Sequence, residues 1–338
     1  MKPNDFEWEI FPDRSTFGIS KTIRINDHKL HILFRSETEM GKIMPPFRHL
    51  EADGSTSRFS SLKIYVFQND GSDKNFPVWE RLNKSASPVK KLLMYNRDRL
   101  HILYNDESQV LTAIDTQKAE AYYYMPQMDR MPYYEKAAPM RMIFHHWALV
   151  NQMILIHGAC ISFGDKGLLL AGKGGTGKST TAVSAALSGF DYIGDDYVLA
   201  DPDKQTIHSL YSSSKIRWDA TDILPVARDL TVNEKDEDDK GIFFLRDVKG
   251  STLPPSVSLS AVILPQIGKV TSSKYTRTTI TEGLMSLGSS TIFQMPGSGK
   301  ETLTGISALL RGIPVYRMTL SRDTDEINSK LREMISEL

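Results

Sequence analysis

The chain lacks the features that mark secreted and membrane-spanning proteins. Of its 338 residues only Cys160 is a cysteine, so no internal disulfide can form, which favours a reducing compartment such as the cytoplasm. No stretch approaches the roughly 18 apolar residues of a membrane-spanning helix, and residues 1–9 contain no apolar core of a secretion signal. The sequence therefore predicts a cytoplasmic protein without a membrane partner.

An excess of charge of either sign is also lacking. Lys and Arg together number 41, as do Asp and Glu, and no segment gathers the basic residues into a stripe. Because nucleic-acid binding requires positive charge against the phosphate backbone, the composition predicts no nucleic-acid partner. The apolar fraction of 40% and the charged fraction of 24% are ordinary for a globular chain, whose length allows two domains.

The most informative stretch is the glycine-rich segment at 166–180, in which a short apolar strand leads into a turn and then into a helix. Four residues match the pattern G-x-x-x-x-G-K-[ST], namely Gly172, Gly177, Lys178 and Ser179. The strand and helix on either side make an ordinary glycine-rich turn the weaker interpretation. We therefore predict a phosphate-binding loop and call residues 172–179 the phosphate loop.

The residue types of this loop suit a nucleoside triphosphate. Glycines allow successive backbone N–H groups to turn inward around phosphate oxygens, and the helix adds the positive end of its dipole. Lys178 would reach the β and γ phosphates, and the Ser179 hydroxyl would bind Mg²⁺. The residues expected to bind the nucleotide are Gly172, Lys173, Gly174, Gly175, Thr176, Gly177, Lys178, Ser179 and Thr180. A second glycine-rich stretch at 296–301 fails the pattern and predicts only the start of a helix.

The alternation of apolar and polar residues predicts two domains. Residues 1–135 read as a β-rich domain, in which the tyrosines at 122–124 belong to a packed strand. Residues 136–338 read as an α/β domain that begins with a helix at 140–153. Because adjacent histidines on a helix point in different directions, His145 and His146 are not expected to share a metal. Other elements are expected at 21–25, 29–34, 62–67 with a turn at 69–72, 99–104, 109–114, 119–124, 154–161, 206–212, 241–245, 260–265, 301–311, 314–319 and 324–338.

A phosphate loop indicates a nucleotide but not a reaction, and the nearest candidates for the reaction are Asp195 and Asp196. They lie 17 and 18 residues beyond Lys178, in a strand expected at 190–201. One carboxylate could complete the Mg²⁺ shell with Ser179, and the other could accept the proton of an attacking hydroxyl. Because a phosphate loop precedes them, a role in the reaction is a better interpretation of these two aspartates than a structural role in a turn or helix cap.

Three further residues could belong to the site. His157 lies 15 residues before Gly172, on a strand expected beside the loop strand, and could bind phosphate or a carboxylate or be a satisfied core residue. Lys215 and Arg217 could contact the transferred phosphoryl group or an acidic peptide, although surface salt bridges are the simpler explanation. The acidic run at 233–241 is typical of a solvated surface loop.

Three motifs together resemble a known family. His157-Gly158, the phosphate loop and Gly194-Asp195-Asp196 resemble the kinase domain of HPr kinase/phosphorylase, whose nucleotide core is similar to that of phosphoenolpyruvate carboxykinase. The resemblance covers about residues 154–200. It implies an open mixed sheet, with Asp195 as catalytic base, Asp196 as a supporting acid near the metal, Ser179 as a Mg²⁺ ligand and His157 as a partner of the phosphates.

The family's downstream Glu-Arg-Gly and Pro-Gly-Arg-Asn motifs have no clear counterpart here, which disfavours recognition of its phosphocarrier protein and the reverse dephosphorylation. The layout looks more like the HPr-kinase-like proteins of peptide-tailoring gene sets, including kinases that phosphorylate a serine at the tail of a lasso precursor peptide. We therefore expect an ATP- and Mg²⁺-dependent kinase acting on a serine of a peptide or small protein, docked by the β-rich domain.

Two other classes of function remain open. One is a nucleotide hydrolase or carboxykinase-like enzyme, and the other is a non-catalytic, ATP-gated peptide-binding module. The sequence does not distinguish ATP from GTP or pyrophosphate, and it leaves the oligomeric state open, a homo-oligomer included.

Overall fold

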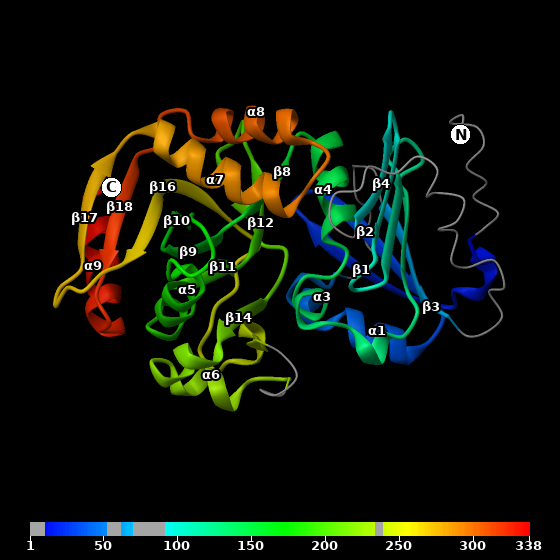
Figure 1. The fold of residues 1–338 in the computed structure, drawn as a ribbon, viewed down its shortest axis with the longest axis horizontal. Coiled ribbons are helices and arrows are strands. Elements are labelled where there is room, and N and C mark those ends of the chain that lie inside the picture. The colour runs from blue at the N-terminus through cyan, green and yellow to red at the C-terminus, as the bar shows by residue number, and fades with distance from the viewer. Residues whose placement is uncertain (1–10, 53–61, 70–91, 234–238) are drawn as a thin grey trace. The chain divides into compact units, whose positions relative to one another are not determined.

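The structure is a computed structural model that describes residues 11–52, 62–69, 92–233 and 239–338 (Figure 1). Most of the turn predicted at 69–72 and of the acidic run at 233–241 lies outside these residues. The chain divides into two compact units, the first made of Met1–Pro45 and Leu50–Val150 and the second of Pro46–His49 and Asn151–Leu338. Both contain sheets and helices, which confirms the mixed α/β class. Among the described residues, no helix is long and apolar enough to cross a membrane.

The first unit is built on a seven-stranded sheet of order β1-β2-β3-β7-β6-β5-β4. The elements expected at 21–25 and 29–34 are the strands β1 and β2, which pair as a hairpin with Asn26 in the left-handed conformation at the turn. The elements expected at 99–104, 109–114 and 119–124 are the strands β5, β6 and β7, which pair in antiparallel order as a meander. The strands are β1 (Ile19–Ile25), β2 (His28–Phe34), β3 (Leu62–Gln68), β4 (Leu92–Arg97), β5 (Leu100–Asn105), β6 (Val110–Asp115) and β7 (Glu120–Met125), with short helices α1 (Glu37–Ile43) and α3 (Tyr133–Ala137).

Aromatic residues fill one face of this sheet. The rings of Tyr65 and Tyr122 stack with their centroids 5.0 Å apart, and Phe67 packs against Tyr124. Tyr123 points to the other face, where its hydroxyl donates a hydrogen bond of 2.9 Å to Glu135. All three tyrosines at 122–124 are buried, which confirms that they belong to a packed strand.

Helix α4 (Arg141–Val150) belongs to the first unit, whereas the sequence predicted a boundary at 135/136 and a longer helix in the second domain. The reason lies in what its apolar face covers. His146 stacks on His101 of β5 with ring centroids 3.9 Å apart, and the Trp147 ring packs edge-on against His28 of β2. The helix therefore completes the core of the first sheet.

The buried histidines of α4 predict that the first unit loses stability in mild acid. Burial, with a smaller effect of His101, lowers the pKa from 6.5 to about 4 for His145 and to about 2 for His146. In the unfolded chain these two histidines are therefore protonated as the pH falls below 6.5, whereas in the folded unit they stay neutral. We expect the free energy of unfolding to fall by about 2 kcal/mol per histidine between pH 6.5 and 5.

Urea unfolding followed by circular dichroism at pH 7, 6 and 5 measures this loss. A His146→Leu variant should show a smaller fall in stability over the same range, because it removes one of the two titrating groups. Equal stability of the wild-type protein at pH 7 and pH 5 would contradict burial of these histidines in neutral form.

The second unit is built on a nine-stranded mixed sheet that includes the path β11-β9-β10-β16-β13-β12-β8, with β18 beside β16 and β17 beside β18. Strands β10, β16 and β18 are parallel to one another. The sheet strands are β8 (Ile154–His157), β9 (Ala159–Phe163), β10 (Lys166–Leu170), β11 (Asp191–Gly194), β12 (Tyr197–Asp201), β13 (Thr206–His208), β16 (Ser256–Ile267), β17 (Lys274–Thr278) and β18 (Val315–Leu320). A separate two-stranded ribbon consists of β14 (Ser213–Arg217) and β15 (Lys240–Phe244).

Helices cover both faces of this sheet (Figure 1). Along β18, Val315 and Arg317 contact α7, whereas Met318 and Leu320 lie in the core formed with α5 and α9. The alternation of side chains along a strand thus places α7 on one face and α5 with α9 on the other. The helices are α5 (Lys178–Leu187), α6 (Pro225–Asp229), α7 (Ile280–Gln294), α8 (Gly299–Leu309) and α9 (Thr324–Glu337).

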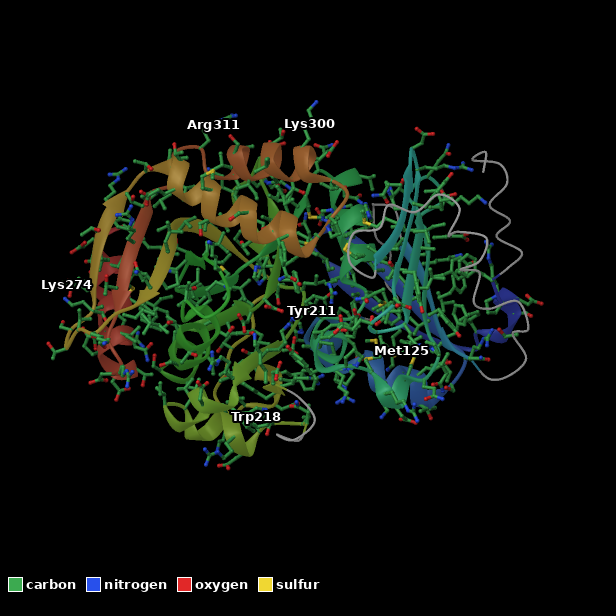
Figure 2. All side chains as sticks on the ribbon, viewed as in Figure 1. Met125, Tyr211, Trp218, Lys274, Lys300 and Arg311 are labelled. Carbon is green, nitrogen blue, oxygen red and sulfur yellow. The ribbon has the colours of Figure 1, made fainter. Side chains whose placement is uncertain are left out.

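Figure 2 labels both exposed and buried side chains of this unit. Lys274, Lys300 and Arg311 are exposed and point outward. Tyr211 is fully buried, and its ring centroid lies 5.2 Å from that of Phe47, in the short segment 46–49 that belongs to this unit. The predicted helix start at 296–301 is confirmed, since α8 begins at Gly299.

Candidate active site

The phosphate loop has the conformation that its glycines permit. It connects the end of β10 to the start of α5, and Gly175 and Gly177 have φ angles of 82° and 103°, a region that residues with side chains rarely adopt. A Cβ atom added at Gly174 or Gly175 would meet nothing within 4 Å. The outer side of the loop is therefore open, as close approach by a phosphate requires. Thr176 and Thr180 are half-buried.

Lys178 stabilises the loop from inside. Its ammonium donates hydrogen bonds of 2.7 Å to the carbonyl of Gly172 and 3.1 Å to that of Lys173. Burial lowers the pKa of Lys178, and the negative charges of Asp195 and Asp196 oppose that shift. The side chain of Lys173, by contrast, is exposed. Of the two loop lysines, Lys178 is thus the one whose charge is held within the site.

Two strands that the sequence predicted as continuous are each interrupted at the site. Gly158 separates β8 from β9, and Asp195 with Asp196 separates β11 from β12, so the acids lie in a turn rather than in a strand. The backbone N–H of Gly158 donates to the carbonyl of Asp196 over 3.1 Å, which joins the two interruptions. A Cβ atom at Gly158 would lie 2.9 Å from the carbonyl oxygen of Leu170, so glycine is required there.

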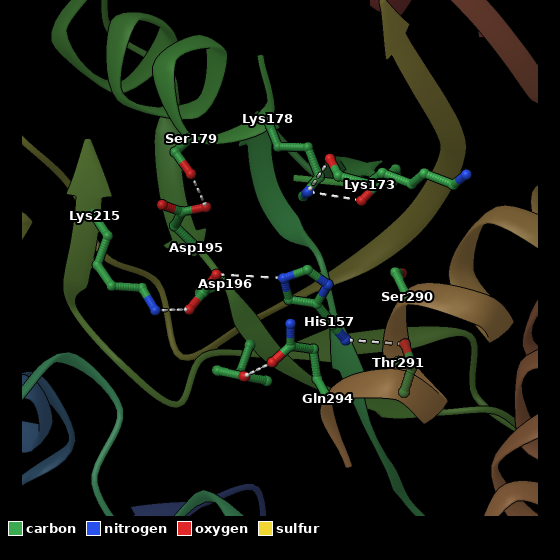
Figure 3. A network of polar contacts seen from close by, with 12 residues as sticks. His157, Lys173, Lys178, Ser179, Asp195, Asp196, Lys215, Ser290, Thr291 and Gln294 are labelled. Atoms are coloured by element: carbon green, nitrogen blue, oxygen red, sulfur yellow. Dashed lines mark hydrogen bonds and ion pairs between the residues drawn. The ribbon is translucent and has the colours of Figure 1, made fainter. Parts of the chain in front are cut away.

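The turn at the two acids is strained. The N–H of Tyr197 donates to the carbonyl of Asp195 over 2.8 Å, and Asp196 between them has a φ of 69°. A hydrogen bond across two residues with a positive φ at the central residue is typical of a γ-turn, a conformation that costs energy for a residue with a side chain. The turn brings both carboxylates into one polar network (Figure 3).

Asp195 is held by two serine hydroxyls. Ser179 donates to its Oδ1 over 3.0 Å and Ser214 to its Oδ2 over 2.7 Å. The carboxylate is buried, and this burial, reinforced by the charge of Asp196, raises the pKa of Asp195 despite both hydrogen bonds. A carboxylate in this setting takes up a proton more readily than an exposed aspartate does.

Asp196 lies between two basic side chains. Its carboxylate forms an ion pair with the Lys215 ammonium, and its Oδ1 lies 3.4 Å from Nε2 of His157. Burial by itself would raise the pKa of Asp196, but the charge of Lys215 and the contact with His157 outweigh it and hold the pKa well below its usual range. Asp196 is therefore held as a carboxylate by its two neighbours.

His157 reaches the site from a different strand than the sequence predicted. Its strand, β8, pairs with β12, and it is the continuation β9 that pairs with the loop strand β10. The backbone N–H of His157 donates to Oγ1 of Thr291 on α7 over 3.1 Å (Figure 3). His157 is thus fixed both by the sheet and by a helix remote in sequence.

The two basic residues of β14 that the sequence proposed for the site, Lys215 and Arg217, have different surroundings in the structure. Lys215 joins the network through Asp196, whereas the guanidinium of Arg217 pairs with Asp219, and both of these side chains are exposed. The surface salt-bridge interpretation is therefore confirmed for Arg217.

Four residues that the sequence did not suggest also belong to the network. They are Ser214, Thr291, Tyr197 and Gln294, and the side-chain oxygen of Gln294 accepts a hydrogen bond of 3.3 Å from the Tyr197 hydroxyl. A signal for α7 was present, because Thr279 caps the helix by accepting from the N–H of Glu282, three residues on. Nothing local marks Ser214, which lies 19 residues from Asp195.

The donor set suits a magnesium-bound nucleotide. The Ser179 hydroxyl and the Asp196 carboxylate are the hard oxygen ligands that Mg²⁺ prefers, and the open loop beside the Lys178 ammonium suits phosphate oxygens. Within the described part of the chain, no three His, Cys, Asp or Glu side chains gather to hold a metal by themselves. A Mg²⁺ ion bound with a nucleotide takes only one or two ligands from protein carboxylates.

Comparison with protein-family models gave no match, and comparison with curated proteins gave none either. The geometry of the site therefore carries the functional interpretation.

Proposed function

We propose that this chain is a Mg²⁺-dependent kinase that transfers the γ-phosphoryl group of ATP to a hydroxyl group. The observation that carries the proposal is the 3.0 Å hydrogen bond from Ser179 to Asp195. Ser179 is the loop hydroxyl expected on the metal beside the terminal phosphates. In the proposed reaction, the buried carboxylate next to it accepts the proton of the acceptor hydroxyl.

The chain's residues divide the chemistry as follows. The acceptor oxygen forms a bond to the γ-phosphorus while the bond to the β–γ bridging oxygen breaks, and ADP leaves with that oxygen. Asp195 takes the proton of the acceptor hydroxyl, and Lys178 stabilises negative charge on the phosphate oxygens. Ser179 and Asp196 would hold Mg²⁺, which neutralises phosphate charge when bound. Lys215 and His157 keep Asp196 ionised and oriented for that role.

The resemblance of His157-Gly158, the phosphate loop and Gly194-Asp195-Asp196 to HPr-kinase-like proteins supports a serine acceptor in a peptide or small protein. The mixed sheet of the second unit agrees with the open mixed sheet of that family. A lasso precursor peptide is the acceptor that the overall layout favours, with the first unit as its docking part in the cytoplasm.

The test is transfer of label from γ-labelled ATP, with Mg²⁺, to peptides encoded beside the gene. The proposal expects label on a serine and little phosphate release without peptide. Steady phosphate release without any acceptor would instead indicate a hydrolase. Nucleotide-dependent peptide binding without movement of label would indicate a binding module, and parallel reactions with GTP and pyrophosphate identify the donor.

A further inference from the structure

The two serines that hold Asp195 cannot play the same part during turnover. Ser179 belongs to the phosphate loop, and its hydroxyl is the one expected to bind the metal when Mg²⁺ and nucleotide arrive. Its oxygen binds the metal through a lone pair while its O–H can keep donating to Oδ1 of Asp195, so the position of Ser179 depends on whether the metal is bound. Ser214 has no such competing ligand, and its 2.7 Å hydrogen bond to Oδ2 is the shorter of the two.

Ser214 is also firmly held in place. It is buried in β14 of the two-stranded ribbon, and the two residues before it are anchored by hydrogen bonds. The hydroxyl of Tyr192, on the strand that leads to Asp195, donates to the carbonyl of Ser213 over 2.7 Å. The N–H of Leu245 donates to the carbonyl of Ser212 over 2.7 Å, and the N–H of Ser212 donates to Pro46 over 2.8 Å. The hydroxyl of Ser214 therefore has a fixed position relative to the turn at Asp195.

We infer that Ser214 is a positioning residue, whose hydroxyl holds the Asp195 carboxylate in the orientation from which it accepts the proton of the acceptor hydroxyl. This inference rests on the proposed kinase function. Ser214 holds the second carboxylate oxygen, Oδ2, from a position that does not depend on the metal, and thereby limits rotation of the carboxylate. A misplacement of the reacting groups of about 1 Å can lower a rate about a hundredfold.

The experiment compares Ser214→Ala with Ser214→Thr, which keeps the hydroxyl. In steady-state transfer assays, Ser214→Ala should lower kcat by about tenfold to a hundredfold and leave KM for ATP within about twofold of the wild-type value. Ser214→Thr should recover most of the lost kcat. The matched control is Ser212→Ala, which removes a buried hydroxyl of the same segment that donates to Pro46, and its kcat should stay within about twofold of wild type.

Equal loss of kcat in Ser212→Ala and Ser214→Ala would overturn the inference, as would a Ser214→Ala enzyme with normal kcat. Crystal structures with Mg²⁺ and a non-hydrolysable ATP analogue give a second measurement that needs no activity. The Asp195 carboxylate should turn away in Ser214→Ala and keep its orientation in Ser212→Ala, and an unchanged carboxylate in Ser214→Ala sinks the positioning role. If the wild-type protein transfers no label, the kinase proposal is wrong. The crystal structures of Ser214→Ala and Ser212→Ala then still show whether Ser214 orients the Asp195 carboxylate.

Discussion

Replacing Asp195 with asparagine is expected to lower phosphoryl transfer by about 10²- to 10⁴-fold, the range that removal of a general base produces. The amide has the shape of the carboxylate, and its oxygen can still accept a hydrogen bond from Ser214 or Ser179. What it loses is the ability to take a proton, which the carboxylate of Asp195 gains from its burial and from the charge of Asp196. The substitution therefore removes a chemical role while it keeps the geometry.

The measurements that check this are the initial rate of label transfer and the affinity for Mg²⁺-ATP by calorimetry. Affinity should stay within about threefold of wild type, because the base acts on the acceptor and not on the phosphates. A matched control is Asp191→Asn, an aspartate at the start of strand β11, which leads to Asp195, and whose carboxylate contacts Ser162. Its transfer rate should be close to wild type. A wild-type transfer rate in the Asp195→Asn enzyme would show that Asp195 is not the general base.

The features that the sequence predicted well are those set by neighbouring residues. The phosphate loop depends on glycines and a lysine within eight positions, with its strand directly before it and its helix directly after it along the chain. The end of α5 is local as well, because Gly189 follows it with a φ of 93°, a conformation that suits glycine. Local backbone geometry thus carries the nucleotide part of the candidate site.

The features that the sequence did not predict depend on pairing between distant segments. Nothing near His157 indicates that its strand pairs with β12, and nothing near Ser214 indicates a hydrogen bond to Asp195. The interruption at Asp195 and Asp196 is also non-local, since it is joined to Gly158 by a backbone hydrogen bond. Likewise, the apolar face of α4 has the same sequence pattern whichever sheet it covers. The sequence therefore predicted the boundary between the units at 135/136, whereas the structure has it at 150/151.

Replacing Lys178 with alanine is the second change with a large expected effect. Its ammonium is buried in the loop and bonded to the carbonyls of Gly172 and Lys173, from which it can reach phosphate oxygens. Unlike the Asp195 variant, this one should weaken both binding and transfer, because the charge attracts the phosphates before the reaction as well as during it. We expect a fall in transfer of about 10²- to 10³-fold and a clear loss of affinity for Mg²⁺-ATP.

Lys173→Ala is the control that separates this specific role from a general loss of positive charge in the loop. Lys173 belongs to the same loop, but its side chain is exposed, and its contribution to the contacts of Lys178 is a backbone carbonyl that alanine retains. Its transfer rate and affinity should stay within about threefold of wild type. Lys178→Ala leaves the carbonyls of Gly172 and Lys173 without their hydrogen-bond donor, and thermal melting of both variants shows whether this loss destabilises the fold. If the two lysine variants lost transfer equally, the loop would attract the nucleotide only through its overall charge, and Lys178 would have no individual part in transfer.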